Sequence, residues 1–189
     1  LMGVILAFVG AVQLKQFGAE IFVANLVAIG MVREMAPLMT AIIMAGRSGA
    51  AFAAQLGTMM VNEEIDAFKT MGFSPMDFLV LPRLIALSLM FPLLALYADF
   101  MGMFGGAVIG ITMLDLSFTQ YFEQTKSALN LVHFSLGLIK AVIYGALVAI
   151  AGCMRGMQSG RSASAVGSAT TSAVVTSIIW IIVASAITT

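Results

Sequence analysis

The chain has 189 residues, of which 61% are hydrophobic and 10% are charged, and its mean hydropathy is +1.06. A soluble domain usually carries about 25% charged residues, because its surface faces water. The composition therefore excludes a soluble enzyme and a disordered linker. Nine basic residues balance nine acidic ones, which leaves no basic surface for a nucleic acid. We expect the chain to lie in a lipid bilayer.

Two further features concern the whole chain. The single cysteine, Cys153, lies in an apolar run and excludes a disulfide framework or a cysteine-based metal site. We interpret it as a small buried side chain. The sequence begins with Leu1 inside an apolar stretch, without the charged start and cleavage site of a signal peptide. We therefore expect a fragment that lacks the natural beginning of its protein.

Apolar stretches predict five membrane spans, because a helix needs about 20 apolar residues to cross the hydrocarbon core. The first span is incomplete. Small residues follow the second span, and we expect that span to continue through them as a helix to residue 60. Pro92 predicts a kink within the third. The fold class is therefore all-α, a single polytopic membrane domain over residues 1–189. The predicted spans are residues 1–14, 21–45, 84–110, 131–154 and 173–187.

The distribution of basic residues predicts the orientation of the chain. The second and fourth connections hold five basic residues if Arg47, at the end of the second span, is included. The first and third connections together hold two. They are Arg47, Lys69, Arg83, Arg155 and Arg161 against Lys15 and Lys126. By the positive-inside rule, the second and fourth connections are cytoplasmic. The third, residues 115–130, then lies on the outer, periplasmic side.

Small residues recur at four-residue spacing in two rows. Such spacing lets helices approach closely in lipid, where packing drives their association. Packing within one subunit and the seam of a dimer both fit this pattern. The rows are Gly102, Gly106 and Gly110, and Gly46, Ala50 and Ala54.

Four charged residues lie inside the predicted spans, where each costs a few kcal/mol and is by default a functional candidate with a partner. Glu34 and Lys140 lie at depths that differ by about 6 Å at 1.5 Å per residue, so a pair between them is predicted. It would fix helix register, form a polar spot in a substrate cavity, or do both. Arg33 is turned by about 100° from Glu34, so we expect it to face another neighbour or the cavity. Asp99 lies nearer the outer surface, and we expect it to be hydrated.

The second connection contains a predicted short helix. Asn62 is a suitable N-cap, and Glu63 and Glu64 suit the positive end of a helix dipole. Gly72 followed by Pro75 predicts where the helix stops.

This predicted helix is amphipathic. Val61, Ile65 and Phe68 share one face, and the polar face is acidic, because Asp66 joins the two glutamates. Helices that rest on lipid usually carry basic residues on their polar face. The acidic face therefore favours a protein partner.

Two long segments resemble a known family. Residues 32–83, which read VREMAPLMTAIIMAGRSGAAFAAQLGTMMVNEEIDAFKTMGFSPMDFLVLPR, resemble the signature region of the MlaE-type permeases, the membrane subunits of ABC systems that move lipids between membranes. Residues 160–177, GRSASAVGSATTSAVVTS, resemble the second cytoplasmic signature of that family. The order of spans also matches, so the resemblance covers nearly the whole chain. Where the family often has an acidic residue, this chain has Gln55.

The resemblance implies partners and roles for particular residues. It implies a homodimer in the bacterial inner membrane, each subunit preceded by an interfacial helix, with an outward-facing lipid cavity between the subunits. It also implies a cytoplasmic ABC ATPase dimer, an MCE-domain protein on the outer side and a STAS-domain protein. Arg33, Glu34 and Lys140 match charged residues of the family, and we expect them to line the substrate cavity. Residues 62–72 would form a coupling helix that docks into the ATPase through Asn62, Glu63, Glu64, Asp66, Phe68 and Met71.

The sequence has no GxxxxGK[ST] pattern, so ATP hydrolysis belongs to another chain. We therefore expect a non-catalytic permease subunit that binds no cofactor and no metal itself, with ATP and Mg²⁺ on the partner ATPase.

Three other classes fit parts of the sequence. Residues 46–49 match the GxSG of intramembrane proteases, but Ser48 and the single histidine, His133, would lie about 30 Å apart. An ion-coupled secondary transporter of an amphiphilic substrate would also use intramembrane charges and a proline-broken helix, yet five spans show no inverted repeat. A membrane scaffold is the third class, and it would tolerate the loss of Glu34 and Lys140.

Overall fold

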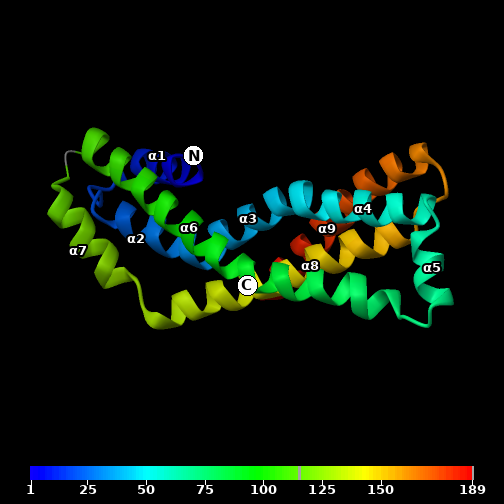
Figure 1. Cartoon of the computed structure of the whole chain (residues 1–189). Helices are drawn as coiled ribbons and strands as arrows, with labels where there is room; N and C mark the ends of the chain where they lie inside the picture. Colours follow the sequence, from blue (N-terminus) through cyan, green and yellow to red (C-terminus); the bar gives the residue numbers. More distant parts are fainter. Residues whose placement is uncertain (115, 189) are drawn as a thin grey trace. The chain divides into compact units, whose positions relative to one another are not determined.

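The computed structural model describes residues 1–114 and 116–188, and all regular elements in that part of the chain are helices (Figure 1). Four helical segments are long and apolar enough to cross a membrane, and a shorter apolar helix precedes them. The four are Phe22–Val61, Met76–Met113, Leu131–Met157 and Ala163–Thr188, and the shorter helix is Met2–Lys15. The predicted all-α polytopic class is confirmed.

The longest segment, Phe22–Val61, has 40 residues and continues well past the apolar stretch of the second predicted span. It consists of α-helices joined by single π-helical turns, a rare geometry that occurs often at functional sites. A further π-helical turn begins the next long segment. In chain order the elements are α1 Met2–Lys15, α2 Phe22–Gly30, η1 Met31–Met35, α3 Ala36–Met44, η2 Ala45–Gly49, α4 Ala50–Val61, α5 Glu64–Thr70, η3 Met76–Val80, α6 Leu81–Met113, α7 Phe118–Ala128, α8 Leu131–Met157 and α9 Ala163–Thr188.

The chain divides into two compact units. Unit 1 consists of Leu1–Pro37 and Leu93–Ile139, and unit 2 consists of Leu38–Pro92 and Lys140–Thr189. In unit 1, α1 and α7 both pack against α2. Its core contains small and branched side chains from α1 and α2, among them Ala7, Ala11, Val23 and Val27.

The glycine row of α6 packs inside unit 1. A Cβ atom at Gly106 would lie 2.7 Å from the hydroxyl oxygen of Tyr121, and one at Gly110 would lie 2.9 Å from a ring carbon of the same residue. At Gly102 it would meet the side chain of Met31. Because these neighbours belong to the same chain, packing within one subunit explains this row. The seam of a dimer is not needed for it.

The third connection contains a helix, α7, that the sequence reading did not predict. Its start carries the Ser-x-x-Gln pattern of a capping box, and the backbone N–H of Ser117 donates to the side-chain oxygen of Gln120 at 3.3 Å. The buried Tyr121 holds α7 against α6, and burial raises the pKa of its phenol to about 12. Asp115, where this predicted connection begins, lies outside the described residues.

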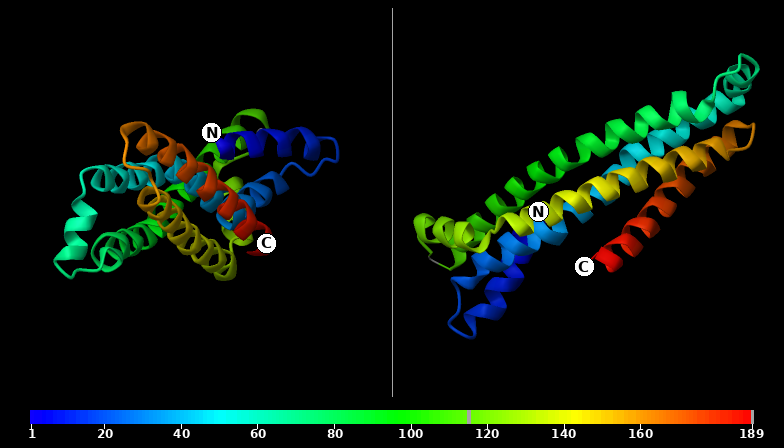
Figure 2. Two further views of the ribbon diagram at one scale, coloured as in Figure 1. Left: turned by 90° about the vertical axis from the view of Figure 1, so that its right-hand side faces the viewer. Right: turned by 90° about the horizontal axis from the view of Figure 1, so that it is seen from below.

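In unit 2, α4 runs beside α9, as Figures 1 and 2 show, and also contacts α8. Glycines set the distance between α8 and the consecutive elements η2 and α4. A Cβ atom at Gly152 would lie 2.7 Å from the backbone oxygen of Gly49, and one at Gly156 would lie 2.9 Å from Cα of Ala53. Backbone therefore lies directly against backbone, which is how helices associate where lipid tails are as apolar as the side chains.

Gly152→Ala is expected to destabilise the protein by about 1–3 kcal/mol, the usual cost of overpacking a core. The added methyl group meets backbone atoms of Gly49, which cannot rotate away. The melting temperature of the purified protein in detergent would measure the loss. Gly167→Ala is the control, because a Cβ atom there has nothing within 4 Å. Equal melting temperatures for the two variants would contradict the packing described here.

Candidate functional site

The predicted helix of the second connection is α5, Glu64–Thr70. The prediction that Asn62 is its N-cap is wrong. Asn62 ends α4, where its backbone N–H donates to Thr58 at 3.0 Å, so a single residue remains for the corner. That residue is Glu63, which has a left-handed conformation with φ 59° and ψ 15°.

The end of α5 follows the sequence prediction. Gly72 has φ +81°, a conformation that glycine adopts without strain. Its N–H donates to Lys69, and the N–H of Phe73 donates to Phe68, at 3.1 and 3.0 Å. These two bonds form a Schellman motif, which satisfies the last carbonyl groups of the helix. The chain therefore leaves α5 in a defined direction.

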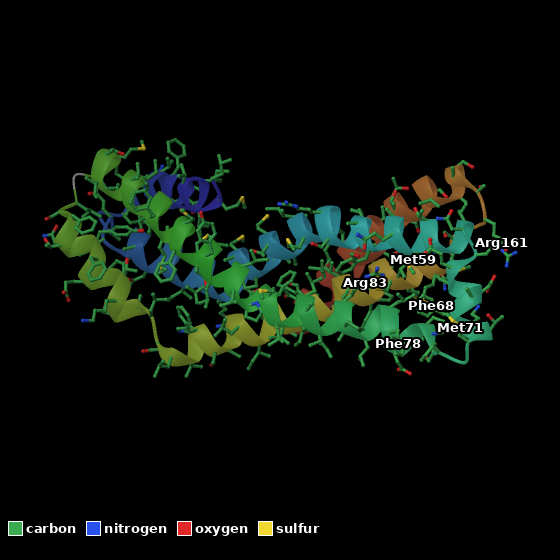
Figure 3. The ribbon with its side chains drawn as sticks, in the orientation of Figure 1. Met59, Phe68, Met71, Phe78, Arg83 and Arg161 are labelled. Atoms are coloured by element: carbon green, nitrogen blue, oxygen red, sulfur yellow. The ribbon has the colours of Figure 1, made fainter. Side chains whose placement is uncertain are left out.

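The apolar face of α5 is confirmed for Ile65 and Phe68, whereas the third predicted member, Val61, is the last residue of α4. Ile65 is 1% exposed and anchors the helix, and Phe68 is half-buried. Beyond the helix, Met71, Phe73 and Phe78 are exposed, and the rings of Phe73 and Phe78 make an edge contact with centroids 5.2 Å apart. Figure 3 labels Met71 and Phe78. We call Met71, Phe73 and Phe78 the apolar patch. Of these three residues, only Met71 is among the predicted site residues. Phe73 directly follows Gly72, and Phe78 lies three residues after Pro75.

The acidic face of α5 is partly neutralised by its own chain. Glu64 accepts a hydrogen bond from the side-chain amide of Asn62 at 3.2 Å. Asp66 pairs with Lys69 at 3.2 Å and with Arg161 at 2.9 Å. Arg161 also lies 3.7 Å from Glu63. The sequence reading expected an acidic face that only a partner would meet, and it did not foresee Arg161, which comes from the connection between α8 and α9.

Arg83 forms a second cluster in unit 2. Its guanidinium lies over the ring of Phe52, 5.7 Å from the centroid, and donates to the side-chain oxygen of Gln55 at 3.3 Å. Arg83 and Gln55 line a shallow pocket of about 400 Å³ with Ala54, Thr58 and Met59. Gln55 therefore accepts a hydrogen bond from Arg83 with a neutral side chain, at the position where the family often has an acidic residue.

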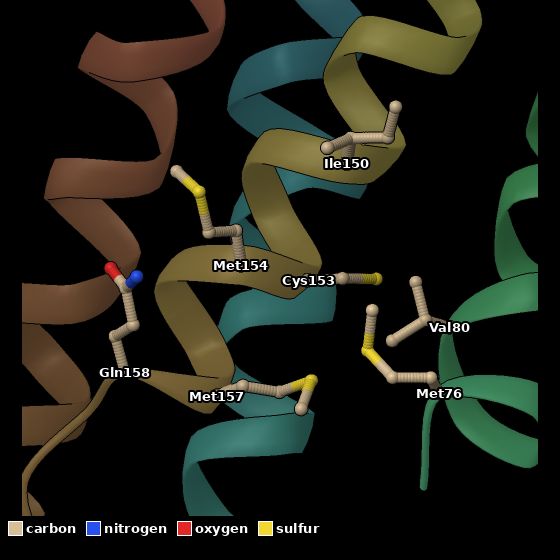
Figure 4. A pocket seen from close by; sticks show the side chains of 7 residues that line it. All are labelled: Met76, Val80, Ile150, Cys153, Met154, Met157 and Gln158. Carbon is tan, nitrogen blue, oxygen red and sulfur yellow. The ribbon is translucent and has the colours of Figure 1, made fainter. Parts of the chain in front are cut away.

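A larger pocket of about 450 Å³ lies between the start of the third span and the end of α8 (Figure 4). Its lining is mostly apolar and rich in methionine. Cys153 is 1% exposed, which confirms its interpretation as a buried side chain. The lining residues are Met76, Val80, Ile150, Cys153, Met154, Met157 and Gln158.

The charged pair of the second span lies in the π-helical turn η1. Arg33 Nε lies 3.8 Å from Glu34 Oε1, and the two side chains are 38% and 25% exposed. The expectation that Arg33 faces another neighbour or the cavity did not include this contact with Glu34, and its placement at the cavity stays a prediction. Its reasoning used the turn of an α-helix, but a π-helical turn has more residues, so consecutive side chains diverge less. Long side chains close the remaining distance.

Lys140 and Asp99 are both buried, each 4% exposed. Glu34 and Lys140 belong to different units, so their pairing stays a prediction. The expected hydration of Asp99 is wrong. Its Oδ1 has no hydrogen-bond partner among the described residues, and it lies on the same helix face as the buried Ala95 and Gly102. Depth along a span, the sole basis of that expectation, does not show which face is buried.

Gln55→Glu is expected to stabilise the protein by up to about 1 kcal/mol, the range for a partly exposed ion pair. A carboxylate would accept a charge-assisted hydrogen bond from Arg83. The melting temperature in detergent would show the gain. The same substitution in an Arg83→Met background is the control and should give no gain. An equal shift in both backgrounds would exclude the pair as its cause.

The comparisons with known proteins agree with this architecture. The chain matches the family described as Permease MlaE over residues 1–189. It is 39% identical over 183 residues to a probable ABC transporter permease protein of Rickettsia typhi, which covers 97% of this chain and 71% of that protein. It is 35% identical over 184 residues to another such protein of Synechocystis, with 97% and 70% covered. It is 34% identical over 172 residues to the chloroplastic protein TRIGALACTOSYLDIACYLGLYCEROL 1 of Arabidopsis thaliana, with 91% and 49% covered. The chain therefore belongs to the MlaE permease family of multi-pass membrane proteins.

Proposed function

We propose that the chain is the non-catalytic permease subunit of an ABC transporter that moves phospholipid-like lipids between membranes, powered by a separate ATPase chain. The observation that carries this proposal is α5, a seven-residue helix between two long apolar helices. It has one buried anchor, Ile65, and carries acidic and apolar side chains on its exposed surface. A loop that only joins two spans needs neither the anchor nor the Schellman motif at its end.

The proposed partners follow from the family. Residues 62–72 would be the coupling helix on the cytoplasmic side, docked on an ABC ATPase dimer that binds ATP and Mg²⁺. Two copies of the chain would form the lipid cavity in the bacterial inner membrane, together with an MCE-domain protein on the outer side and a STAS-domain protein. Lipid as the substrate is supported by the family and by the name of the relative from Arabidopsis thaliana, which contains that of a diacylglycerol lipid.

The proposed mechanism uses the continuity of the helices. α5 follows α4 after the C-cap Asn62 and the corner residue Glu63, and α4 ends the 40-residue segment that begins with Phe22. Closure of the ATPases would pull α5 and move α4 and α6 with it. Arg33 and Glu34 lie on the same continuous segment as α4, so the movement would reach the headgroup of a lipid held near them and Lys140. The lipid tails would contact apolar side chains, as most small-molecule sites require.

Glu64→Lys is expected to weaken the association with the ATPase at least about tenfold, which corresponds to ~1.4 kcal/mol. Glu64 is preferred to Asp66 for this test, because reversing Asp66 would also break its pair with Arg161. Copurification of the ATPase with the tagged permease measures the effect. Glu123→Lys, an exposed charge reversal in α7, is the control and should leave association unchanged. Full association and lipid transport by Glu64→Lys would refute the coupling role.

The double substitution Glu34→Ala with Lys140→Ala is expected to lower ATP-driven lipid transfer about tenfold, again ~1.4 kcal/mol, while ATPase association stays normal. Transfer of a fluorescent phospholipid in proteoliposomes that contain all partners measures the rate. Mass spectrometry of the lipids that copurify in nanodiscs identifies the substrate. Lys126→Ala in α7 is the control. Transfer driven by a proton or sodium gradient without ATP would instead favour a secondary transporter, and unchanged transfer in the double variant would remove these residues from the cavity.

A further inference from the structure

Arg161 links two connections that are far apart in the sequence. It lies between the end of α8 and the start of α9, 95 residues from Asp66. Its Nη2 donates to Oδ2 of Asp66 at 2.9 Å, and its Nη1 lies 3.7 Å from Oε1 of Glu63. Figure 3 labels Arg161. One guanidinium therefore holds both the corner residue before α5 and a residue of its first turn.

Glu63 is the place where this corner is strained. Of the non-glycine residues in the described ranges, it alone has a positive φ. A residue with a Cβ atom pays a steric cost in the left-handed region. In this conformation the carboxylate of Glu63 lies 3.7 Å from Nη1 of Arg161. The direction in which α5 leaves α4 thus depends partly on a residue outside the second connection.

The connection between α8 and α9, which carries Arg161, packs closely against α4. A Cβ atom at Gly57 of α4 would lie 3.1 Å from Oγ of Ser159 and 3.2 Å from a methyl group of Val166, so the connection rests closely on α4. Ser162 directly precedes α9, and its hydroxyl oxygen accepts a hydrogen bond from the N–H of Ala165 at 3.2 Å. A guanidinium that extends from such a base can transmit force, which a side chain on a loose loop cannot.

The contacts of Arg161 are too exposed to hold the fold together. The side chains of Arg161, Glu63 and Asp66 are 64%, 70% and 41% exposed, and pairs of that kind contribute little to stability. The fold of unit 2 rests on buried residues such as Leu56, Val148 and Ile181. What the pairs can set is the orientation of a seven-residue helix with a single buried anchor.

We propose that Arg161 is a positioning residue for α5, and that it makes the connection between α8 and α9 a second route by which movement of α5 reaches the membrane helices. The functional half of this inference rests on the proposed role of α5 as the coupling helix. The first route is covalent and runs through α4 and α6. Arg161 adds the start of α9 and the end of α8, so that one displacement of α5 acts on four helices.

The first test is hydrogen–deuterium exchange on the purified permease alone. Arg161→Ala is expected to speed amide exchange of residues 64–70 by up to about fivefold, the upper limit for exposed pairs, without lowering the melting temperature. Arg161→Lys should restore part of the protection. Lys69→Ala is the matched control, because Lys69 pairs with the same carboxylate from within α5 and does not link it to α9. Equal exchange in Arg161→Ala and the wild type, or an equal increase in Lys69→Ala, would overturn the positioning role.

The second test measures coupling in the complex with the ATPase. Arg161→Ala should keep ATPase association within about twofold but raise the ATP hydrolysed per lipid transferred by up to about fivefold. Arg161→Lys should bring this ratio back toward the wild-type value, whereas Arg161→Glu, which places a third carboxylate beside Glu63 and Asp66, should be worse than Arg161→Ala. A ratio that Arg161→Ala leaves unchanged would overturn the second route. If the wild-type chain binds no ATPase, the proposed function fails, and the exchange experiment still decides whether Arg161 positions α5.

Discussion

Direct backbone contact between α4 and α8 is the constraint on which the rest of unit 2 depends. Lipid tails are as apolar as leucine, so helices in a bilayer gain nothing from hiding apolar surface and must instead fit closely. Gly152 against Gly49 and Gly156 against Ala53 provide this fit. They fix the end of α8 against η2 and the first part of α4, and the two connections that follow these helices meet because of it. The ion pairs of Arg161 are a product of that packing.

The sequence predicts well whatever depends on neighbouring residues. The apolar stretches and α5 follow from hydropathy and from helix signals within a few positions, and Gly72 ends α5 as expected. The helix α7 also has a local signal, the Ser-x-x-Gln pattern at its start, although hydropathy alone predicts only a connection there. Contacts between distant segments are different. No local pattern shows that Arg161 reaches Asp66, that Asp99 lies on a buried face, or that η1 brings Arg33 toward Glu34.

The charges of α5 change how recognition by a partner should be viewed. Intramolecular pairs already engage Glu63 and Asp66, and an amide engages Glu64. The electrostatic attraction between α5 and a basic partner would therefore be weaker than the acidic sequence suggests. The apolar patch would supply much of the contact area. Charge would then set orientation and the rate of encounter, while Met71 and Phe78 would set how long the complex lasts.

The apolar patch also has a consequence for the synthesis of the protein. Its three large side chains are exposed: Met71 and Phe73 follow the short helix α5, and Phe78 lies in η3. Contiguous apolar surface of this kind promotes self-association when it meets water. A subunit produced in excess over its partner would be prone to aggregate through this surface. Balanced production of the two chains would therefore protect the cell as well as supply the complex.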